Sequence, residues 1–206
     1  MSMERPRLLT FDIFGTVLDW RTGLGISGAD FERVIDRQGE LEQQKRFRPY
    51  AEIVAQSLVD VVRLNAVLAA AAGAEAGRWP LFPDSREAMA RLRRVAPCVA
   101  MTNSDRAHGV QVQEQLGELD GWVCAEEVRV YKPDAKVWHE VAKRRSVAFG
   151  PRWWHVSAYA DYDLKTAREL GLTCVLVRRP HCRPGPADLE VKDLGELADR
   201  LESPEA

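Results

Sequence analysis

Short apolar runs recur along this sequence, and segments of helical periodicity separate them. The run that begins at Leu8 delivers a carboxylate, Asp12, into a turn that contains Gly15. Such a run is typical of a buried parallel strand, whose carboxyl end opens onto the ligand crevice of an α/β sheet. Taken alone, Asp12 also fits an aspartate that only begins a turn. Later runs, which predict further strands, cover residues 97–101, 122–124, 154–158 and 174–177.

Residues 20–80 show helical periodicity. Pro49 suits the first turn of a helix, and apolar residues follow it at spacings of three and four from Tyr50 to Leu64. A stretch rich in Arg, Gln and Glu precedes this segment, and an alanine-rich stretch follows it. We therefore predict that residues 20–80 form an inserted α-helical cap.

From Asp84 onward, amphipathic segments alternate with apolar runs. Repeated alternation of strand and helix predicts a parallel, doubly wound sheet. The predicted fold class is α/β, with a Rossmann-like parallel sheet core formed by residues 1–19 and 81–206 and interrupted by the helical cap. The helices expected in this core cover residues 84–94, 106–116, 132–144, 164–170 and 193–201.

Composition narrows the class of protein. The 206 residues are 46% hydrophobic, enough for a sizeable core, and the formal net charge is −2 without a basic stripe. A nucleic-acid or membrane partner is therefore not expected, and a small-molecule ligand is. The four cysteines show no CxxC pair or zinc spacing and are predicted to be reduced core thiols. No apolar segment typical of a signal peptide precedes Asp12, so we expect a cytoplasmic protein.

Polar signatures follow four of the predicted strands. A carboxylate at Asp12 can attack an electrophilic centre, and Lys132 can keep that carboxylate ionised. Thr102 and nearby backbone N–H groups can hold anionic oxygens of a substrate. The signatures are Asp12-Ile13-Phe14-Gly15-Thr16, Thr102-Asn103-Ser104, Tyr131-Lys132-Pro133-Asp134 and Asp161-Tyr162-Asp163.

In this order the signatures resemble the haloacid dehalogenase superfamily, and most of all its type II 2-haloacid dehalogenases. The resemblance covers nearly the whole chain and implies a Rossmann-like core, an aspartate nucleophile and a covalent aspartyl ester. Carried onto this sequence, it implies catalytic roles for Asp12, Thr102, Lys132 and Asp163. Asp163 would position or activate the water that hydrolyses the ester, although it also fits a residue that only caps its helix.

Phe14 separates two activities within this superfamily. The phosphatases have a second aspartate two residues after the nucleophile, where it protonates the departing alkoxide. A phenyl ring has no proton to give, whereas a halide needs none to leave. The 2-haloacid dehalogenases carry an aromatic residue at this position, so Phe14 favours displacement of halide from carbon.

The resemblance extends into the predicted cap. Residues 37–42, with the sequence Arg-Gln-Gly-Glu-Leu-Glu, match an Arg-Gln-x-x-Leu-Glu context in which the dehalogenases present an arginine to the substrate. Arg37 is therefore the implied clamp for a substrate carboxylate, because a guanidinium forks onto a carboxylate with two parallel hydrogen bonds. The alternative is a solvated arginine on a charged helix face.

The fourth signature departs from the family. Ala158 and Ala160 stand where the dehalogenases have Ser and Asn, and Ala158 also replaces one metal-binding aspartate of the phosphatases. Asp161, Tyr159 or Ser157 is expected to substitute for the missing polar groups, and no metal ligand is assigned. The complete set of predicted substrate-binding residues is Phe14, Thr16, Arg37, Asn103, Tyr159 and Asp161.

The sequence therefore predicts a 2-haloacid dehalogenase-like hydrolase that acts on a small carboxylic acid and requires no cofactor. Two alternatives stay open: a Mg²⁺-dependent phosphatase, and a catalytically diverged relative with a specialised or binding role. The resemblance also implies a homodimer.

Overall fold

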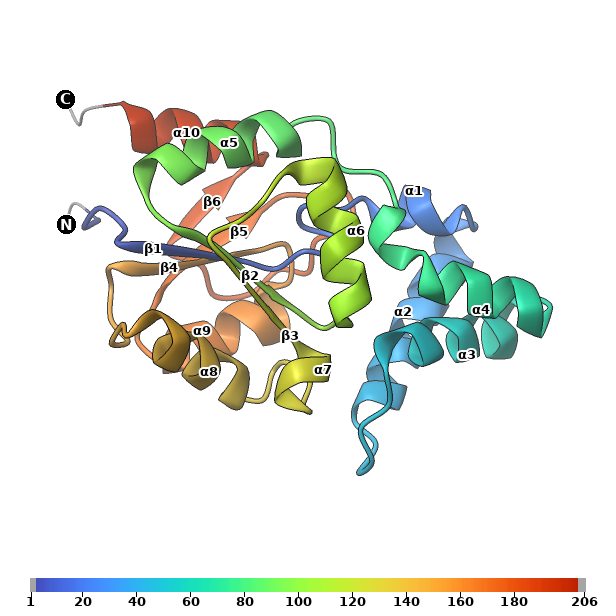
Figure 1. Cartoon of the computed structure of the whole chain (residues 1–206). Helices are drawn as coiled ribbons and strands as arrows, with labels where there is room; N and C mark the ends of the chain where they lie inside the picture. Colours follow the sequence, from blue (N-terminus) through green and yellow to red (C-terminus); the bar gives the residue numbers. More distant parts are fainter. Residues whose placement is uncertain (1–2, 204–206) are drawn as a thin grey trace.

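A six-stranded, all-parallel sheet forms the centre of the protein (Figure 1). The computed structural model describes residues 3–203. Strand order is β3-β2-β1-β4-β5-β6, which confirms the predicted α/β class. The strands are β1 (Leu8–Phe11), β2 (Cys98–Thr102), β3 (Gly121–Cys124), β4 (Trp153–Ser157), β5 (Thr173–Val177) and β6 (Leu189–Val191).

Helices cover both faces of the sheet, so its central strands are buried along their whole length. Side chains of a strand point alternately to opposite faces. In β1, Leu9 packs in one core cluster with Leu92 of α5 and Leu197 of α10, whereas Leu8 packs in a second cluster with Trp138 of α8. These helices are α5 (Ser85–Val95), α6 (Arg106–Leu116), α7 (Ala125–Val128), α8 (Lys136–Arg145), α9 (Lys165–Glu169) and α10 (Leu194–Glu202).

A helical insertion separates β1 from the rest of the core and lies to one side of the sheet (Figure 1). Its two ends meet, because the Asp19 N–H donates to Pro80 O at 2.8 Å and Leu18 pairs with Leu81. We call this insertion the cap. Its helices are α1 (Trp20–Leu24), α2 (Gly28–Glu42), α3 (Tyr50–Val62), α4 (Ala66–Ala74) and the 3₁₀ turn η1 (Ala76–Arg78).

Polar side chains of the core hold the cap in place. Both carboxylate oxygens of Asp105, just before α6, accept from the Tyr50 and Ala51 N–H groups at 2.8 Å. Asp105 therefore caps α3, whose own preceding residue, Pro49, offers no side-chain cap. His108 Nδ1 accepts from the Asp105 N–H, so its Nε2 donates to Gly73 O in α4 at 2.9 Å.

Replacing Asp105 with alanine should loosen this joint. Two N–H groups at the start of α3 would lose a charged acceptor, so we expect a loss of about 1–3 kcal/mol in the free energy of unfolding. Urea unfolding followed by circular dichroism measures it. Asp199→Ala, which removes only an exposed ion pair, is the control and should change stability by less than about 1 kcal/mol. Equal stability of the two variants would contradict the capping role.

Two further expectations concern cysteines and membranes. All four cysteines are free, and Cys98, Cys124 and Cys174 are buried in the core, as predicted. Among residues 3–203 there is no helix with the length and apolar character needed to cross a membrane.

Candidate active site

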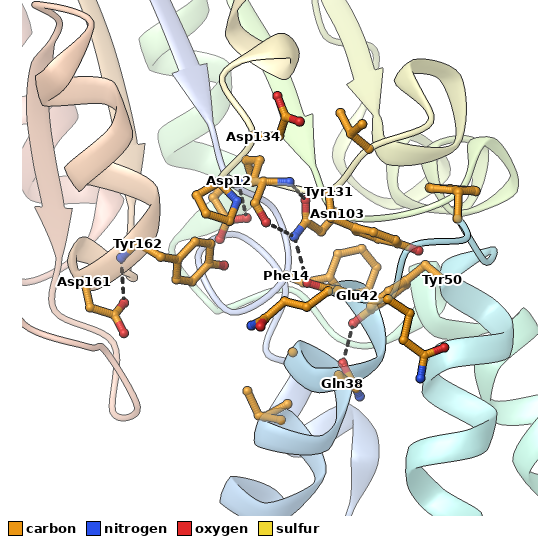
Figure 2. A pocket seen from close by; sticks show the side chains of 18 of the residues that line it. Asp12, Phe14, Gln38, Glu42, Tyr50, Asn103, Tyr131, Asp134, Asp161 and Tyr162 are labelled. Atoms are coloured by element: carbon orange, nitrogen blue, oxygen red, sulfur yellow. Dashed lines mark hydrogen bonds and ion pairs between the residues drawn. The ribbon is translucent and has the colours of Figure 1, made fainter.

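A cavity of about 530 Å³ lies between the carboxyl ends of the strands and helix α2 of the cap (Figure 2). Asp12 reaches it from the end of β1, at the point where strand order reverses between β1 and β4. Parallel α/β sheets place their ligands at such a reversal. Phe14, Asn103, Lys132 and Asp161 also line the cavity, which therefore gathers residues from all four polar signatures.

The turn after β1 fixes the Asp12 carboxylate. Gly15 has φ of +86°, and a side chain there would lie 2.5 Å from the Tyr159 hydroxyl, so only glycine fits this tight turn. The turn brings Thr16 Oγ1 to 2.7 Å from Asp12 Oδ2, to which it donates. The same hydroxyl accepts from the Ala158 N–H at 2.9 Å and is thereby held in one orientation.

Lys132 lies between two buried carboxylates. Its Nζ donates to Asp12 Oδ1 at 3.0 Å and to Asp163 Oδ2 at 2.8 Å. Asp163 belongs to a π-helical turn, η2 (Ala160–Leu164), that follows β4, and π turns often occur at functional sites. The arrangement brings three of the four predicted catalytic side chains into contact.

Burial and charge set the protonation of this triad. Burial raises the pKa of Asp12, with Asp163 adding to the effect and Lys132 opposing it. Burial opposes the charge on Lys132, but Asp12 and Asp163 outweigh it and raise the pKa of the ammonium. Burial also opposes ionisation of Asp163, yet Lys132 and His155 together lower its pKa. The site thus holds a permanent cation beside the carboxylate of Asp12.

His155 extends the triad into the sheet. Trp153 Nε1 donates to Thr10 Oγ1 at 2.8 Å, and this hydroxyl lies 2.8 Å from His155 Nδ1. The other ring nitrogen, Nε2, lies 3.1 Å from Asp163 Oδ1, and His155 contributes to the lowered pKa of Asp163. His155 therefore supports the ionised form of Asp163. Sequence reasoning left His155 without a role, because a histidine within an apolar strand gives no signal of its partner.

Asn103 connects the sheet, the lysine turn and the cap. Its Oδ1 accepts from the Lys132 N–H at 2.7 Å, and its Nδ2 donates to Lys132 O at 3.1 Å. Nδ2 also donates to Glu42 Oε2 at 3.1 Å (Figure 2). Asn103 lines the cavity as predicted, and its hydrogen bonds fix the position of Lys132.

Phe14 forms part of an aromatic wall of the cavity. Its ring meets Tyr50 and Trp79 edge to face, with centroids 5.2 and 5.8 Å away. Tyr131 and Tyr162 add further aromatic lining. One wall of the cavity is therefore aromatic, and Phe14 supplies no proton donor to it.

Other predicted site residues lie behind the cavity wall. Thr102 is buried with its hydroxyl unpartnered among the described residues, and it does not line the cavity. Tyr159 is buried as well, and its hydroxyl lies 2.9 Å from His181 Nδ1. Asp163 and Thr16 do not line the cavity either. Each is hydrogen-bonded to a residue that does, Asp163 to Lys132 and Thr16 to Asp12. Of the predicted substrate-binding set, Phe14, Asn103 and Asp161 line the cavity.

Arg37 is not placed where the resemblance implies. Its Nε donates to Asp60 Oδ2 and its Nη1 to Glu40 Oε2, both at 2.8 Å, and the side chain is half-exposed. The neighbouring residues Gln38 and Gly39 of α2 line the cavity, but Arg37 does not. Because one helix residue turns the side chain by about 100°, Arg37 faces α3 instead.

The two alanines of the fourth signature lie beneath a loop of the core. The loop after β5 crosses directly over them: the Arg183 N–H donates to Ala158 O, and the Ala160 N–H donates to Arg183 O, both at 2.9 Å. Gly185 then approaches so closely that a Cβ on it would lie 2.7 Å from the Ala160 carbonyl carbon. The loop therefore leaves little space for a larger side chain at position 160.

Arg183 of this loop lines the cavity and reaches the cap. Its Nη2 lies 3.0 Å from Asp36 Oδ1 in α2, and its Nη1 lies 3.8 Å from Asp161 Oδ2. The sequence analysis missed this residue because the loop from residue 178 to 188 carries no recognisable signature.

The donor set does not suit a divalent cation. Across residues 3–203 no three His, Cys, Asp or Glu side chains are grouped as metal ligands. Between the two carboxylates that would have to share an ion, Asp12 and Asp163, stands the ammonium of Lys132. Ala158 contributes no oxygen from its side chain, and hard cations require several oxygen ligands.

Comparisons with known proteins agree with this architecture. Residues 6–151 match the family model of haloacid dehalogenase-like hydrolases. A search of curated proteins gives no match.

Solved structures share the fold. L-2-haloacid dehalogenase PA0810 is 23% identical with a TM-score of 0.83, over 95% of this chain and 99% of that one. The L-2-haloacid dehalogenase of Xanthobacter autotrophicus with chloropropionic acid covalently bound is 16% identical (TM-score 0.80; 94% and 97% covered). The magnesium-bound putative hydrolase YfnB of Bacillus subtilis is 15% identical (TM-score 0.79; 97% and 100% covered).

Proposed function

Since this chain belongs to the haloacid dehalogenase-like hydrolases, we propose that it hydrolyses the carbon–halogen bond of a small 2-halogenated carboxylic acid. Asp12 is the proposed nucleophile, and the reaction requires no cofactor. The observation that carries the proposal is the position of the Asp12 carboxylate in a cavity with an aromatic wall. Lys132 and Thr16 donate hydrogen bonds to this carboxylate, and position 14 is a phenylalanine that cannot act as a general acid.

The proposed reaction has two steps. An oxygen of Asp12 attacks the carbon that bears the halogen, the carbon–halogen bond breaks, and the halide leaves with the bonding electrons. Water then attacks the carbonyl carbon of the Asp12 ester, and the hydroxy acid departs. Asp163 is buried behind Lys132, so its part in the second step is to hold that ammonium beside Asp12. One proton of the water passes to the oxygen of the departing hydroxy acid, and the second is released to solvent as Asp12 returns to its carboxylate form, so the overall reaction yields one halide ion and one proton.

The phosphatase alternative receives less support. A phosphomonoester leaves as an alkoxide that needs a proton, and Phe14 has none to give. Ala158 also stands where the phosphatases have one of their metal-binding aspartates, and its side chain contributes no oxygen.

A parallel screen tests the proposal. Halide release from 2-chloropropionate and 2-bromopropionate, and phosphate release from p-nitrophenyl phosphate, are measured with EDTA and with added Mg²⁺. We expect halide release that EDTA leaves unchanged. Incubation in H₂¹⁸O under single-turnover conditions should place ¹⁸O in Asp12, because the ester is cleaved at its carbonyl carbon. Mg²⁺-dependent phosphate release without halide release would overturn the proposal.

The role of Arg37 can be decided separately. A forked carboxylate clamp predicts that Arg37→Lys lowers kcat/KM by one to two orders of magnitude, or ~1.4–3 kcal/mol. The ion pairs of Arg37 with Asp60 and Glu40 instead predict a change of less than about threefold, since the side chain does not line the cavity. We expect the smaller change. Steady-state kinetics with 2-chloropropionate measures it, and a loss of tenfold or more would restore the clamp.

A further inference from the structure

We propose that Glu42, in the last turn of α2, is a neutral carboxylic acid that donates a hydrogen bond to an anionic group bound in the cavity. The inference extends the proposed function, because that reaction brings in one anion, the substrate carboxylate, and produces a second, the halide. Glu42 reaches the cavity from the cap, whereas Asp12 reaches it from the sheet (Figure 2).

The position of Glu42 disfavours a negative charge. It is the last residue of a 15-residue helix whose final turn contains no basic residue. The carboxyl end of a helix carries a partial negative charge, so an ionised carboxylate is destabilised there. Within residues 3–203 no Lys, Arg or His forms an ion pair with Glu42. A half-buried carboxyl without a cation partner favours its neutral form.

The hydrogen bonds of Glu42 leave one oxygen free to carry the proton. Oε2 accepts from Asn103 Nδ2 at 3.1 Å, and Asn103 is itself fixed by two hydrogen bonds to the Lys132 backbone. Oε1 has no hydrogen-bond partner among the described residues. A protonated Oε1 would thus be a hydrogen-bond donor that the contact at Oε2 holds in place and that has no acceptor among the described residues.

The groups around Glu42 reinforce this state. Burial raises the pKa of Glu42 to about 8, with Asp12 adding to the rise, and Asn103 and Lys132 only partly offset it. Tyr50, Tyr131 and Tyr162 are further titratable neighbours, and burial raises the pKa of each, so all three stay neutral in the physiological range.

The protonation state of Glu42 determines how tightly the cavity binds an anion. A neutral acid donates to a carboxylate or a halide, as an amide or hydroxyl would. An ionised Glu42 would add a second negative charge beside Asp12 and would repel the same anion. Anion binding should therefore weaken as pH rises through about 8, in proportion to the fraction of Glu42 that is still protonated.

The first test measures protonation directly and needs no substrate. The full-length protein with ¹³C-labelled glutamate carboxyls is titrated by NMR, and the spectrum of Glu42→Gln identifies the Glu42 signal. We expect this signal to titrate near pH 8. Titration in the ordinary range of exposed glutamates, about pH 4–5, would overturn the proposal.

The second test measures anion binding by calorimetry with two probes. Sodium propionate stands for the substrate carboxylate and sodium bromide for the halide. For at least one probe we expect binding to weaken about tenfold between pH 7 and pH 9, and the probe affected identifies which anion Glu42 receives. In Glu42→Gln, whose amide donates at every pH, binding should be present at pH 7 and independent of pH.

Glu40→Gln is the matched control. Glu40 lies on the same helix, is exposed and pairs with Arg37, so its variant should bind both probes with the pH dependence of the parent. Binding that does not change with pH in the parent, or the same decline in Glu42→Gln as in the parent, would overturn the role of Glu42. Neither test uses turnover, so a failure of the proposed dehalogenation leaves both results interpretable.

Discussion

Replacing Asp12 with asparagine should lower halide release by at least about four orders of magnitude, or ~5 kcal/mol in the barrier. Thr16 and Lys132 jointly orient this carboxylate, through hydrogen bonds of 2.7 and 3.0 Å. An amide is far less nucleophilic and cannot form the ester intermediate. Single-turnover measurements with 2-bromopropionate give the rate of the first step.

The control for Asp12→Asn is a measurement that shows the variant is still folded. Because the amide keeps the size of the side chain, the circular dichroism spectrum should match that of the parent. Mass spectrometry must establish that the variant has not deamidated. Turnover near the parent level in such a preparation would rule out Asp12 as nucleophile.

Replacing Lys132 with methionine should cause the second large effect, on stability as well as activity. The ammonium is fully buried, and its removal leaves the carboxylates of Asp12 and Asp163 facing each other without a cation. Loss of one member of a buried ion pair costs about 3–5 kcal/mol, so the free energy of unfolding measured in urea should fall by that amount. Halide release should fall as well, because Asp12 would hold a proton more tightly.

A double variant separates charge from packing. In Lys132→Met, the further change Asp163→Asn removes one of the two stranded charges, so it should recover part of the lost stability. In the parent the same change removes a paired charge and should destabilise. Effects of Asp163→Asn that are equal in the two backgrounds would contradict the electrostatic coupling.

Much of the fold was predictable because its signals are local. The apolar runs predicted strands β1 to β5 to within two residues, and the helix expected over residues 106–116 coincides with α6. Strand β6 and the short helices α1 and α7 were not predicted. Each has only three to five residues and depends on contacts with distant parts of the chain, which periodicity does not report.

The site was predictable wherever a residue follows a strand directly. Asp12 and Asn103 lie at the cavity for that reason, whereas Lys132 is separated from β3 by α7 and was predicted from its Lys-Pro-Asp signature. Arg37 and Glu42 show the limit: both belong to the matched stretch of the cap, but the helical rotation of α2 directs Glu42 to the cavity and Arg37 to Asp60. A sequence match identifies the helix, whereas helix packing decides which of its faces meets the substrate.

The close approach of Gly185 to Ala160 has a consequence for protein engineering. Installing the dehalogenases' asparagine at Ala160 would force its side chain toward a backbone that already excludes a single added carbon on Gly185. The effect of this substitution therefore depends on the conformation of the loop from residue 178 to 188, which also contains Arg183. Grafting a more typical dehalogenase site onto this chain requires exchanging that loop together with residues 158–160, as one unit of sequence.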